Sequence, residues 1–247
     1  MLPFFLNPMK EKLIGHLSKF VTDRRVQLFD TLLNYRTRYI TVVLEDLYQP
    51  HNASAVLRSC ECFGIQDIHI IENLNEYRIS PDVALGSHKW LNLYRYNKET
   101  ENTRPAIELL KKKGYRIVAT TPHKNDCTLD EFDLDKGKVA LLFGSELKGL
   151  SPLAMQLADE FVKIPMVGFT ESLNISVTAA IFIHHLTGKL HNSPHIQWQL
   201  PDEEKQQIKL AWLKNTIRKS ELIENAFLND QNLNEKNDAF NSTAQTD

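Results

Sequence analysis

The chain has 247 residues, of which 42% are hydrophobic and 24% are charged, and its formal net charge is −2. This length provides a sizeable core for one large domain or two small ones, and the composition is that of an ordinary globular protein. The small negative charge excludes a uniformly basic surface but leaves room for a local basic patch.

Cysteine usage and hydropathy restrict the compartment. Cys60, Cys62 and Cys127 include no Cys-x-x-Cys pair, which fits a reducing compartment and argues against a metal site. The apolar N-terminus is interrupted by Pro3 and Pro8 and lacks a basic start, so it does not resemble a signal peptide. No apolar run approaches the ~20 residues that span a bilayer. We therefore expect a cytoplasmic protein with no metal and no membrane segment.

Residues 1–38 predict a helical, basic arm. Apolar residues such as Leu13 and Leu17 fall at helical spacing in this segment. The first 40 residues carry seven lysines and arginines against three acids, and Arg24 and Arg25 are neighbours within this run. A charge run of this kind is either a solvated helix face or a contact for nucleic acid.

Residues 39–190 alternate apolar strands with helical patterns. The strands are rich in β-branched residues, and helical periodicity recurs between them. Strands are expected near 40–44, 67–71, 115–120, 139–143 and 161–164, and helices near 53–63, 103–113, 151–158 and 174–190. This alternation predicts an α/β fold, with a mainly parallel sheet and helices on both of its faces.

The C-terminal segments differ from this domain. Residues 191–228 predict a helical extension that contains one helix over 202–226. The middle of that helix carries the cations Lys209, Lys214, Arg218 and Lys219, with no acid between them. From 229 to 247 the chain turns to Asn, Asp, Gln, Ser and Thr, which bury too little apolar surface to fold. We expect this last segment to be a disordered polar tail.

A first candidate site follows the strand at 40–44. Pro50 stops that strand, and Asn52 then opens a helix in which apolar residues precede Arg58. Asn52 is a natural helix N-cap, which is an alternative to any role in chemistry. An arginine near a buried surface usually pairs with a carboxylate or a phosphate, so Arg58 is a candidate for substrate binding.

A second candidate site is the segment 144–151, which follows the strand at 139–143. Two glycines, Gly144 and Gly149, stand between a strand and a helix, as in a phosphate-binding P-loop. Leu150 stands where that loop requires a lysine, however, and Glu146 inside the loop would repel phosphate. The nucleotide-hydrolase alternative, which predicts ATP or GTP binding, is weakened but stays open.

A third candidate site begins at the strand end Ile164–Met166. A loop with one glycine follows, and Ser172, Asn174 and Ser176 then open an apolar helix. Polar groups at the start of a helix, beside small apolar residues, form a pocket with fixed hydrogen-bonding groups. The alternative is that Ser172 or Asn174 simply caps the helix.

Taken together, the three segments resemble the three signature motifs of the SpoU (TrmH) family of RNA 2′-O-ribose methyltransferases. They occur in the same order and at the same strand-to-helix junctions, and the resemblance spans roughly residues 10–226. The residues that carry it are Asn52 and Arg58, then Phe143–Glu146 with Gly149–Ser151, and then Ile164–Met166 with Ser172–Ser176.

A fourth segment resembles one branch of that family. Gly86–Leu91 is similar to a segment of the enzymes that methylate the D-loop guanosine at position 18 of tRNA, although an ordinary loop with a buried Trp90 is an alternative. The implied activity is S-adenosylmethionine-dependent 2′-O-methylation of that guanosine. A SpoU-type enzyme for ribosomal RNA or another tRNA position is a second possibility, and an inactive RNA-binding module is a third.

The resemblance implies further structure and partners. It implies a trefoil knot in the C-terminal half of the domain, with S-adenosylmethionine bound in the knotted loops. It also implies a homodimer with active sites beside the subunit interface, and tRNA as the substrate. The domain over 39–190 is therefore expected to be a methyltransferase domain of the SPOUT type, the α/β knot superfamily that includes SpoU.

The same resemblance assigns roles to residues. Arg58 would act on the reacting phosphate or hydroxyl. A guanidinium is a hydrogen-bond donor with no acceptor, which suits it to stabilise an alkoxide rather than to remove a proton. The groups that position it and the ribose would be Asn52, Glu146, Ser172 and Asn174. The cofactor would contact Thr120, Gly144, Ile164, Met166 and Leu173. The expected RNA contacts are Arg24, Arg25, Lys89, Lys209, Lys214 and Arg218.

Overall fold

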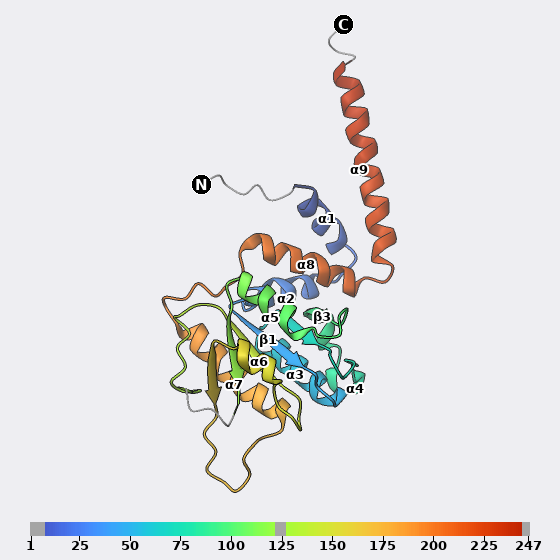
Figure 1. Cartoon of the computed structure of the whole chain (residues 1–247). Coiled ribbons are helices and arrows are strands. Elements are labelled where there is room, and N and C mark those ends of the chain that lie inside the picture. Colours follow the sequence, from blue (N-terminus) through green and yellow to red (C-terminus); the bar gives the residue numbers. More distant parts are fainter. Residues whose placement is uncertain (1–7, 122–126, 244–247) are drawn as a thin grey trace. The chain divides into compact units, whose positions relative to one another are not determined.

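The computed structural model describes residues 8–121 and 127–243, with side chains through residue 231. Residues 1–7 of the expected basic arm and residues 244–247 of the expected tail lie outside the described residues. Figure 1 traces the chain from its N-terminus to its C-terminus.

The chain forms two compact units. We call Arg36–Gln199 the sheet unit, and we call the segments that end at Tyr35 and begin at Leu200 the helical unit. The sheet unit corresponds closely to the expected α/β domain, with borders that differ by a few residues at its start and by nine at its end.

Within the described residues, the sheet unit is built on a seven-stranded sheet in the order β3-β2-β1-β6-β4-β7-β5. Every pairing between neighbouring strands is parallel. The strands are β1 (Ile40–Glu45), β2 (Asp67–Ile71), β3 (Asn92–Tyr96), β4 (Arg116–Thr120), β5 (Cys127–Thr128), β6 (Val139–Phe143) and β7 (Glu160–Lys163). The predicted α/β fold with a mainly parallel sheet is confirmed.

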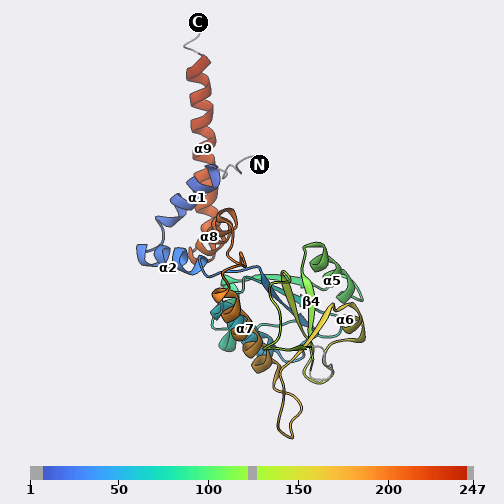
Figure 2. The ribbon, with the colours of Figure 1, turned by 90° about the vertical axis from the view of Figure 1, so that its left-hand side faces the viewer.

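Helices cover both faces of the sheet, as Figure 2 shows. One face carries α3 (Pro50–Cys62) and α7 (Ile175–Asn192), and the other carries α5 (Thr103–Lys112) and α6 (Pro152–Leu157). Two short elements, α4 (Pro81–Ala84) and the 3-10 helix η1 (Ser87–Trp90), pack against α3.

The central strands β1 and β6 are apolar along most of their length because both faces of the sheet are buried there. Val42 and Leu44 of β1 join the core beneath α3 and α7, whereas Val43 joins the core beneath α5 and α6. Leu141 and Leu142 of β6 divide between the two cores in the same way. Successive side chains of a strand point to opposite faces, so burial on both sides removes any alternation with polar residues.

The parallel direction of the strands places the candidate sites together. The loops after β1, β4, β6 and β7 all leave from the carboxyl edge of the sheet. The three motif segments follow β1, β6 and β7, and β1 and β6 are direct neighbours. Segments more than a hundred residues apart in the sequence therefore meet at this edge.

The helical unit contains four described helices: α1 (Pro8–Ser18), α2 (Asp23–Leu33), α8 (Asp202–Thr216) and α9 (Ser220–Thr243). Helix α8 contacts each of the other three. Leu17, Phe29, Trp212 and Leu213 are buried, and the rings of Phe29 and Trp212 meet edge to face with centroids 5.4 Å apart.

The helical unit differs from the expected domain division. The arm over 1–38 and the extension over 191–228 were expected as separate segments, but the structure joins their helices in one unit with borders at Tyr35 and Leu200. The reason is physical, because α1 buries an apolar face against α8 and α9, and α2 buries one against α8.

The predicted helical arm and the predicted helix over 202–226 each contain a break. Residues 9–38 break into α1 and α2, because Thr22 has an extended backbone and serves as the N-cap position of α2. The predicted helix over 202–226 breaks after Thr216, where Ile217 is extended and Lys219 adopts a left-handed φ of 59°. Neither break is marked by glycine or proline, the residues that usually signal one.

The C-terminal segment is helical where a disordered polar tail was expected over 229–247. Helix α9 continues through Thr243, so the structure differs from the prediction over residues 229–243. No glycine or proline lies within Ser220–Thr243, and the segment contains leucine, alanine and glutamate, which favour helix. Composition alone does not distinguish such a polar helix from a disordered segment.

Candidate functional site

The carboxylate of Glu146 joins two loops at the carboxyl edge of the sheet. It accepts hydrogen bonds from the backbone N–H groups of Tyr48 (3.1 Å) and Gln49 (3.3 Å) and from the side-chain amide of Asn52 (2.6 Å). Gln49 is the N-cap residue of α3, and its own side chain does not cap the helix. Glu146 therefore acts as the cap of α3 from a distant loop, with its negative charge at the positive end of the helix.

These contacts determine the protonation of Glu146. Partial burial raises its pKa, but hydrogen bonds from Asn52 and from backbone N–H groups, including those of Tyr48 and Gln49, outweigh burial, so the pKa is lowered. Glu146 is consequently ionised at neutral pH and accepts hydrogen bonds with both oxygens. This state suits it to orient Asn52 and makes it a poor acceptor for a proton.

Asn52 lies inside α3 and is only 2% exposed. The helix begins at Pro50, so the alternative that Asn52 is its N-cap does not hold. Its side-chain amide donates to Glu146 and also to the side-chain oxygen of Gln49 (3.0 Å). Its own oxygen accepts from the amide of Asn174 (3.2 Å). Asn52 therefore connects the first motif to both of the others.

Asn174 combines capping with a contact to the first motif. Its side-chain oxygen accepts from the backbone N–H of Ser176 (2.8 Å) and from the Ser176 hydroxyl (2.6 Å), which caps α7. Its amide nitrogen remains free to donate to Asn52. The capping alternative is thus correct and does not exclude a second role. We call the chain Ser176–Asn174–Asn52–Glu146 the amide relay.

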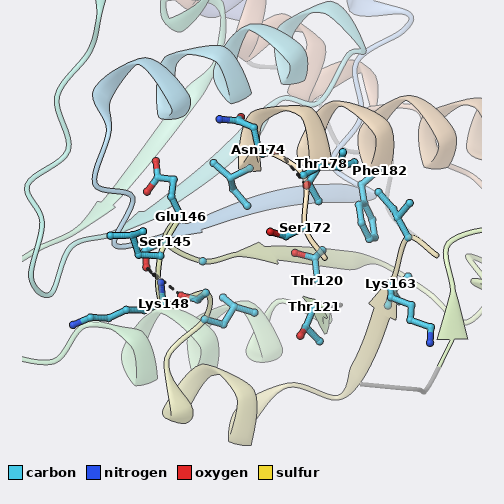
Figure 3. A pocket seen from close by; sticks show the side chains of 18 of the residues that line it. Thr120, Thr121, Ser145, Glu146, Lys148, Lys163, Ser172, Asn174, Thr178 and Phe182 are labelled. Carbon is cyan, nitrogen blue, oxygen red and sulfur yellow. Dashed lines mark hydrogen bonds between the residues drawn. The ribbon is translucent and has the colours of Figure 1, made fainter. Parts of the chain in front are cut away.

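A cavity of about 430 Å³ opens beside the amide relay. Its walls come from the loops after β4, β6 and β7 and from the first two turns of α7. In Figure 3, Ser145 and Glu146 lie on one side of this cavity and Lys163 lies on the other. All five residues expected to meet a cofactor line it, together with three of the predicted positioning residues: Thr120, Gly144, Ile164, Met166, Leu173, Glu146, Ser172 and Asn174.

The cavity walls combine apolar side chains with polar ones. Leu150, Ile164 and Phe182 contribute apolar surface. The Thr120 hydroxyl donates to the backbone oxygen of Leu142 (2.7 Å), which ties β4 to β6 below the cavity. A cavity that combines apolar surface with oriented polar groups can serve as a small-molecule site.

The loop over 144–151 is not shaped as a P-loop. The backbone N–H of Ser145 donates to Gly149 O (3.0 Å), and that of Gly149 donates to Ser145 O (2.9 Å). These N–H groups are satisfied inside the loop and do not point at a common centre, as phosphate binding requires. A Cβ on Gly144 would lie 2.1 Å from the backbone carbon of Gly149, so this glycine permits the loop to close on itself.

Arg58 stands apart from the other predicted catalytic residues. It lies on α3 but is exposed, which differs from the expected position near a buried surface. It does not line the cavity. Asn52 and Arg58 are six residues apart and therefore point roughly 120° away from each other around the helix. Within one chain, the structure brings Asn52, Glu146 and Asn174 together and leaves Arg58 outside.

The predicted RNA contacts separate into two groups. Arg24, Arg25, Lys89 and Arg218 are exposed. In contrast, Lys209 forms an ion pair with Asp30 (2.5 Å), and Lys214 forms one with Glu224 (2.6 Å). These two lysines connect α8 to α2 and to α9, so the acids missing from their own segment come from other helices.

Sequence reasoning did not assign a role to Gln49, whose side-chain oxygen accepts a hydrogen bond from Asn52 of the amide relay. Ser176 was recognised only as one of the polar residues that open a helix, and the structure shows its hydroxyl donating to Asn174. No sequence pattern indicated the contact of Gln49.

Within residues 8–121 and 127–243 we find neither a metal-binding cluster nor a membrane-spanning helix. No cluster of three or more His, Cys, Asp or Glu side chains there is arranged to bind a metal ion. No helix there has both the length and the apolar character needed to cross a membrane.

Comparison with known proteins shows which family this chain resembles. Residues 39–184 match the SpoU rRNA Methylase family. A tRNA (guanosine(18)-2′-O)-methyltransferase of Borreliella burgdorferi is 42% identical over 214 residues, which is 87% of this chain and 95% of that protein. The namesake enzyme of Thermus thermophilus is 32% identical over 78% of this chain and 97% of its own length.

Solved structures show the same fold. The Aquifex aeolicus TrmH/SpoU tRNA modifying enzyme superposes with a TM-score of 0.70 at 27% identity, over 80% of this chain and 98% of that one. The SpoU methyltransferase AviRb of Streptomyces viridochromogenes, solved in complex with the cofactor AdoMet, has a TM-score of 0.54 at 22% identity, over 66% of this chain and 62% of its own.

Removing the carboxylate of Glu146 should change how stability depends on pH. Because the folded pKa of Glu146 is lowered, its contribution is present above the unfolded value of about 4.3 and is lost as pH falls through the folded value. The difference in unfolding free energy between wild type and Glu146→Gln should therefore be largest at neutral pH and shrink in acid. Urea unfolding at a series of pH values measures this, with Glu171→Gln as a control for an exposed carboxylate. A difference that grows in acid would contradict the capping role.

Proposed function

The chain belongs to the SpoU methylase family, and on that premise we propose that it methylates the 2′-hydroxyl of guanosine 18 in tRNA. The proposal is supported by the relative at 42% identity that spans 87% of this chain and carries this activity in its name. The structural observation that carries it is the amide relay, which unites Asn52, Glu146 and Asn174 from three separate segments beside one cavity.

S-adenosylmethionine is the expected cofactor. Bound there, it would supply a methyl group on a positively charged sulfur, which an oxygen nucleophile can attack. The cavity fits such a molecule, because its volume of about 430 Å³ lies in the usual range for small-molecule sites. The apolar side chains in its walls suit an adenine ring. The carboxylate of Glu146 already accepts hydrogen bonds from backbone N–H groups at the start of α3. The similarly folded AviRb was solved with AdoMet bound.

The reaction requires the ribose hydroxyl to be placed in line with the methyl group and its developing negative charge to be stabilised. Asn174 lines the cavity and can hold the ribose, because Asn52 and the rest of the relay fix its side chain. Ser172 lines the same cavity and can donate a hydrogen bond there. Arg58 would stabilise the alkoxide and bind the phosphate, since a guanidinium loses its own proton only at very high pH.

A homodimer would bring Arg58 to the site. Helices α3 and α7 pack side by side, and their outward faces carry Arg58 and Cys62 on α3 and Val177 and Ile181 on α7. Val177 is 46% exposed and Ile181 is 37% exposed, so α7 presents apolar surface that a partner could cover. We infer that a second copy covers this face, so that Arg58 of one copy reaches the cavity of the other.

The chain path supports the proposed trefoil knot. Helix α7 follows β7 in the sequence but packs against α3, which follows β1. Strands β6 and β4 lie between β1 and β7, so the segment from β7 to α7 must cross the loops that leave those strands. A crossing at this position is where the family resemblance implies that the chain threads through a loop.

Contacts with the body of the tRNA would come from exposed cations. Arg24 and Arg25 on α2, Arg218 after α8 and Lys89 in η1 have the exposure that phosphate contacts need. Lys209 and Lys214 are weaker candidates, because each already pairs with an acid of its own unit. The cytoplasm stays the predicted location and is consistent with a tRNA substrate.

Mapping the methylated nucleotide tests the proposed function directly. Unmodified tRNA is incubated with the protein and labelled S-adenosylmethionine, and the labelled nucleotide is then located. Label on the 2′-oxygen of guanosine 18 is the expected result. Label at another tRNA position, or on ribosomal RNA only, would replace the substrate while keeping the chemistry. No transfer to any RNA would contradict the proposal.

Arg58→Ala should abolish methyl transfer without unfolding the protein, because the side chain is exposed and away from the core. Mixing this variant with Asn174→Ala should restore activity, since each mixed dimer then holds one site with both groups intact. Random assortment predicts about a quarter of wild-type activity. If Arg58 acts within its own chain, the mixture stays inactive; if Arg58→Ala is active alone, the assigned role is wrong.

Charge reversal on α2 should weaken tRNA binding. Arg24→Glu combined with Arg25→Glu removes two cations, so affinity should fall and the slope of log affinity against log salt should flatten by about two units. Lys112→Glu, a single reversal at an exposed lysine at the end of α5, is the control for a charge change elsewhere and should leave affinity and slope nearly unchanged. Unchanged affinity and slope in the α2 variant would remove this helix from the RNA interface.

A further inference from the structure

Glu45, the last residue of β1, is a buried carboxylate that the mechanism above does not use. It is only 2% exposed. One of its oxygens accepts from the hydroxyls of Thr103 (2.6 Å) and Ser151 (2.8 Å), and the other accepts from the backbone N–H of Ser151 (2.8 Å). No Lys or Arg side chain among the described residues forms an ion pair with it.

The contact between Glu45 and Ser151 matters because of where Ser151 lies in the chain. Ser151 ends the loop over 144–151, and its hydroxyl accepts from the backbone N–H of Ala154 (3.0 Å) to cap α6. Glu45 therefore fixes the C-terminal end of that loop to β1. Glu146 fixes the opposite end of the same loop to the start of α3.

The two carboxylates act reciprocally between neighbouring strands. Glu45 comes from β1 and holds the loop after β6, whereas Glu146 comes from the loop after β6 and holds the loop after β1. The next residue, Asp46, has a left-handed φ of 51°. Its carboxylate turns to the loop after β2, where it accepts from three successive backbone N–H groups. The adjacent carboxylates of Glu45 and Asp46 therefore bind two different loops, the one after β6 and the one after β2.

The loop over 144–151 is attached to the rest of the sheet unit near its two ends. Leu147 at its tip is 93% exposed, and the backbone pair between Ser145 and Gly149 lies within the loop itself. The same loop supplies Gly144, Glu146 and Leu150 to the cavity. A shift at Ser151 would therefore change the cavity wall and the placement of Glu146 together.

We propose that Glu45 is a positioning residue for the methyl-transfer site, which it serves by fixing the loop over 144–151 through Ser151. This inference rests on the proposed function for its effect on catalysis. A buried carboxylate is costly unless its oxygens are supplied with donors, and here three donors from two elements converge on it. A glutamine of the same size has only one oxygen, so its NH₂ group would face at least one of these donors.

Glu45→Gln tests the proposal by hydrogen exchange, cofactor affinity and kinetics. The backbone N–H of Ser151 and its neighbours in the loop should exchange faster than in wild type, with or without cofactor. Affinity for S-adenosylmethionine in calorimetry should fall about tenfold or more. The kcat for tRNA methylation should fall, while the KM for tRNA stays unchanged, because the RNA contacts lie elsewhere.

Glu72→Gln is the matched control. Glu72 is also a buried carboxylate at the end of a strand, but it pairs with Arg95 (2.7 Å) and does not contact the loop over 144–151. This variant should lose thermal stability and keep the wild-type exchange of the loop and the wild-type cofactor affinity. If Glu45→Gln behaves like Glu72→Gln in exchange and affinity, Glu45 is only a structural residue and the proposal is overturned.

A second pair of variants applies if Glu45→Gln does not fold. Ser151→Ala removes the hydroxyl donor, whereas Ser151→Thr keeps it, so only the alanine variant should lose affinity and loop protection. Equal behaviour of the two variants would contradict the proposal. If wild type itself binds no S-adenosylmethionine, the proposed function fails, and the exchange of Ser151 still decides whether Glu45 fixes the loop.

Discussion

The contact between the Glu146 carboxylate and the start of α3 is the interaction on which the site depends. A negative charge at the positive end of a helix is stabilised there, and the three donors around Glu146 lower its pKa and keep it ionised. Asn52 can donate to Glu146 only from inside the first turns of α3, and Asn174 reaches Asn52 only because α7 packs beside α3. The placement of Asn52 and Asn174 beside the cavity thus depends on the Glu146 carboxylate and on the parallel pairing of β1 with β6.

The sequence predicted the parts of this site that depend on strand-to-helix junctions. Asn52, Glu146 and Asn174 lie at such junctions, and parallel strands bring junctions to one edge, so their meeting could be expected. The apolar strands were recognisable because both faces of the sheet are buried. Strand β3 was not predicted, because it lies at the edge of the sheet, where its residues are only partly buried and alternate with polar ones.

Other properties could not be predicted because they depend on contacts distant in the sequence. Lys209 and Lys214 looked like a basic surface, yet their acidic partners come from α2 and α9. Arg58 looked half-buried from its apolar neighbours, although it points away from the core by helix geometry. Glu45 was an ordinary polar residue at a strand end until Thr103 and Ser151 converged on it from 58 and 106 residues away.

We propose that Asn52 and Glu146 act as a single unit in methyl transfer. A double-mutant cycle with Asn52→Ala, Glu146→Ala and the combined variant measures this in kcat/KM for tRNA methylation. We predict that the combined variant is about as slow as the slower single variant, because either change already breaks the relay. Effects that multiply independently, with the combined loss equal to the product of the two single losses, would contradict the claim.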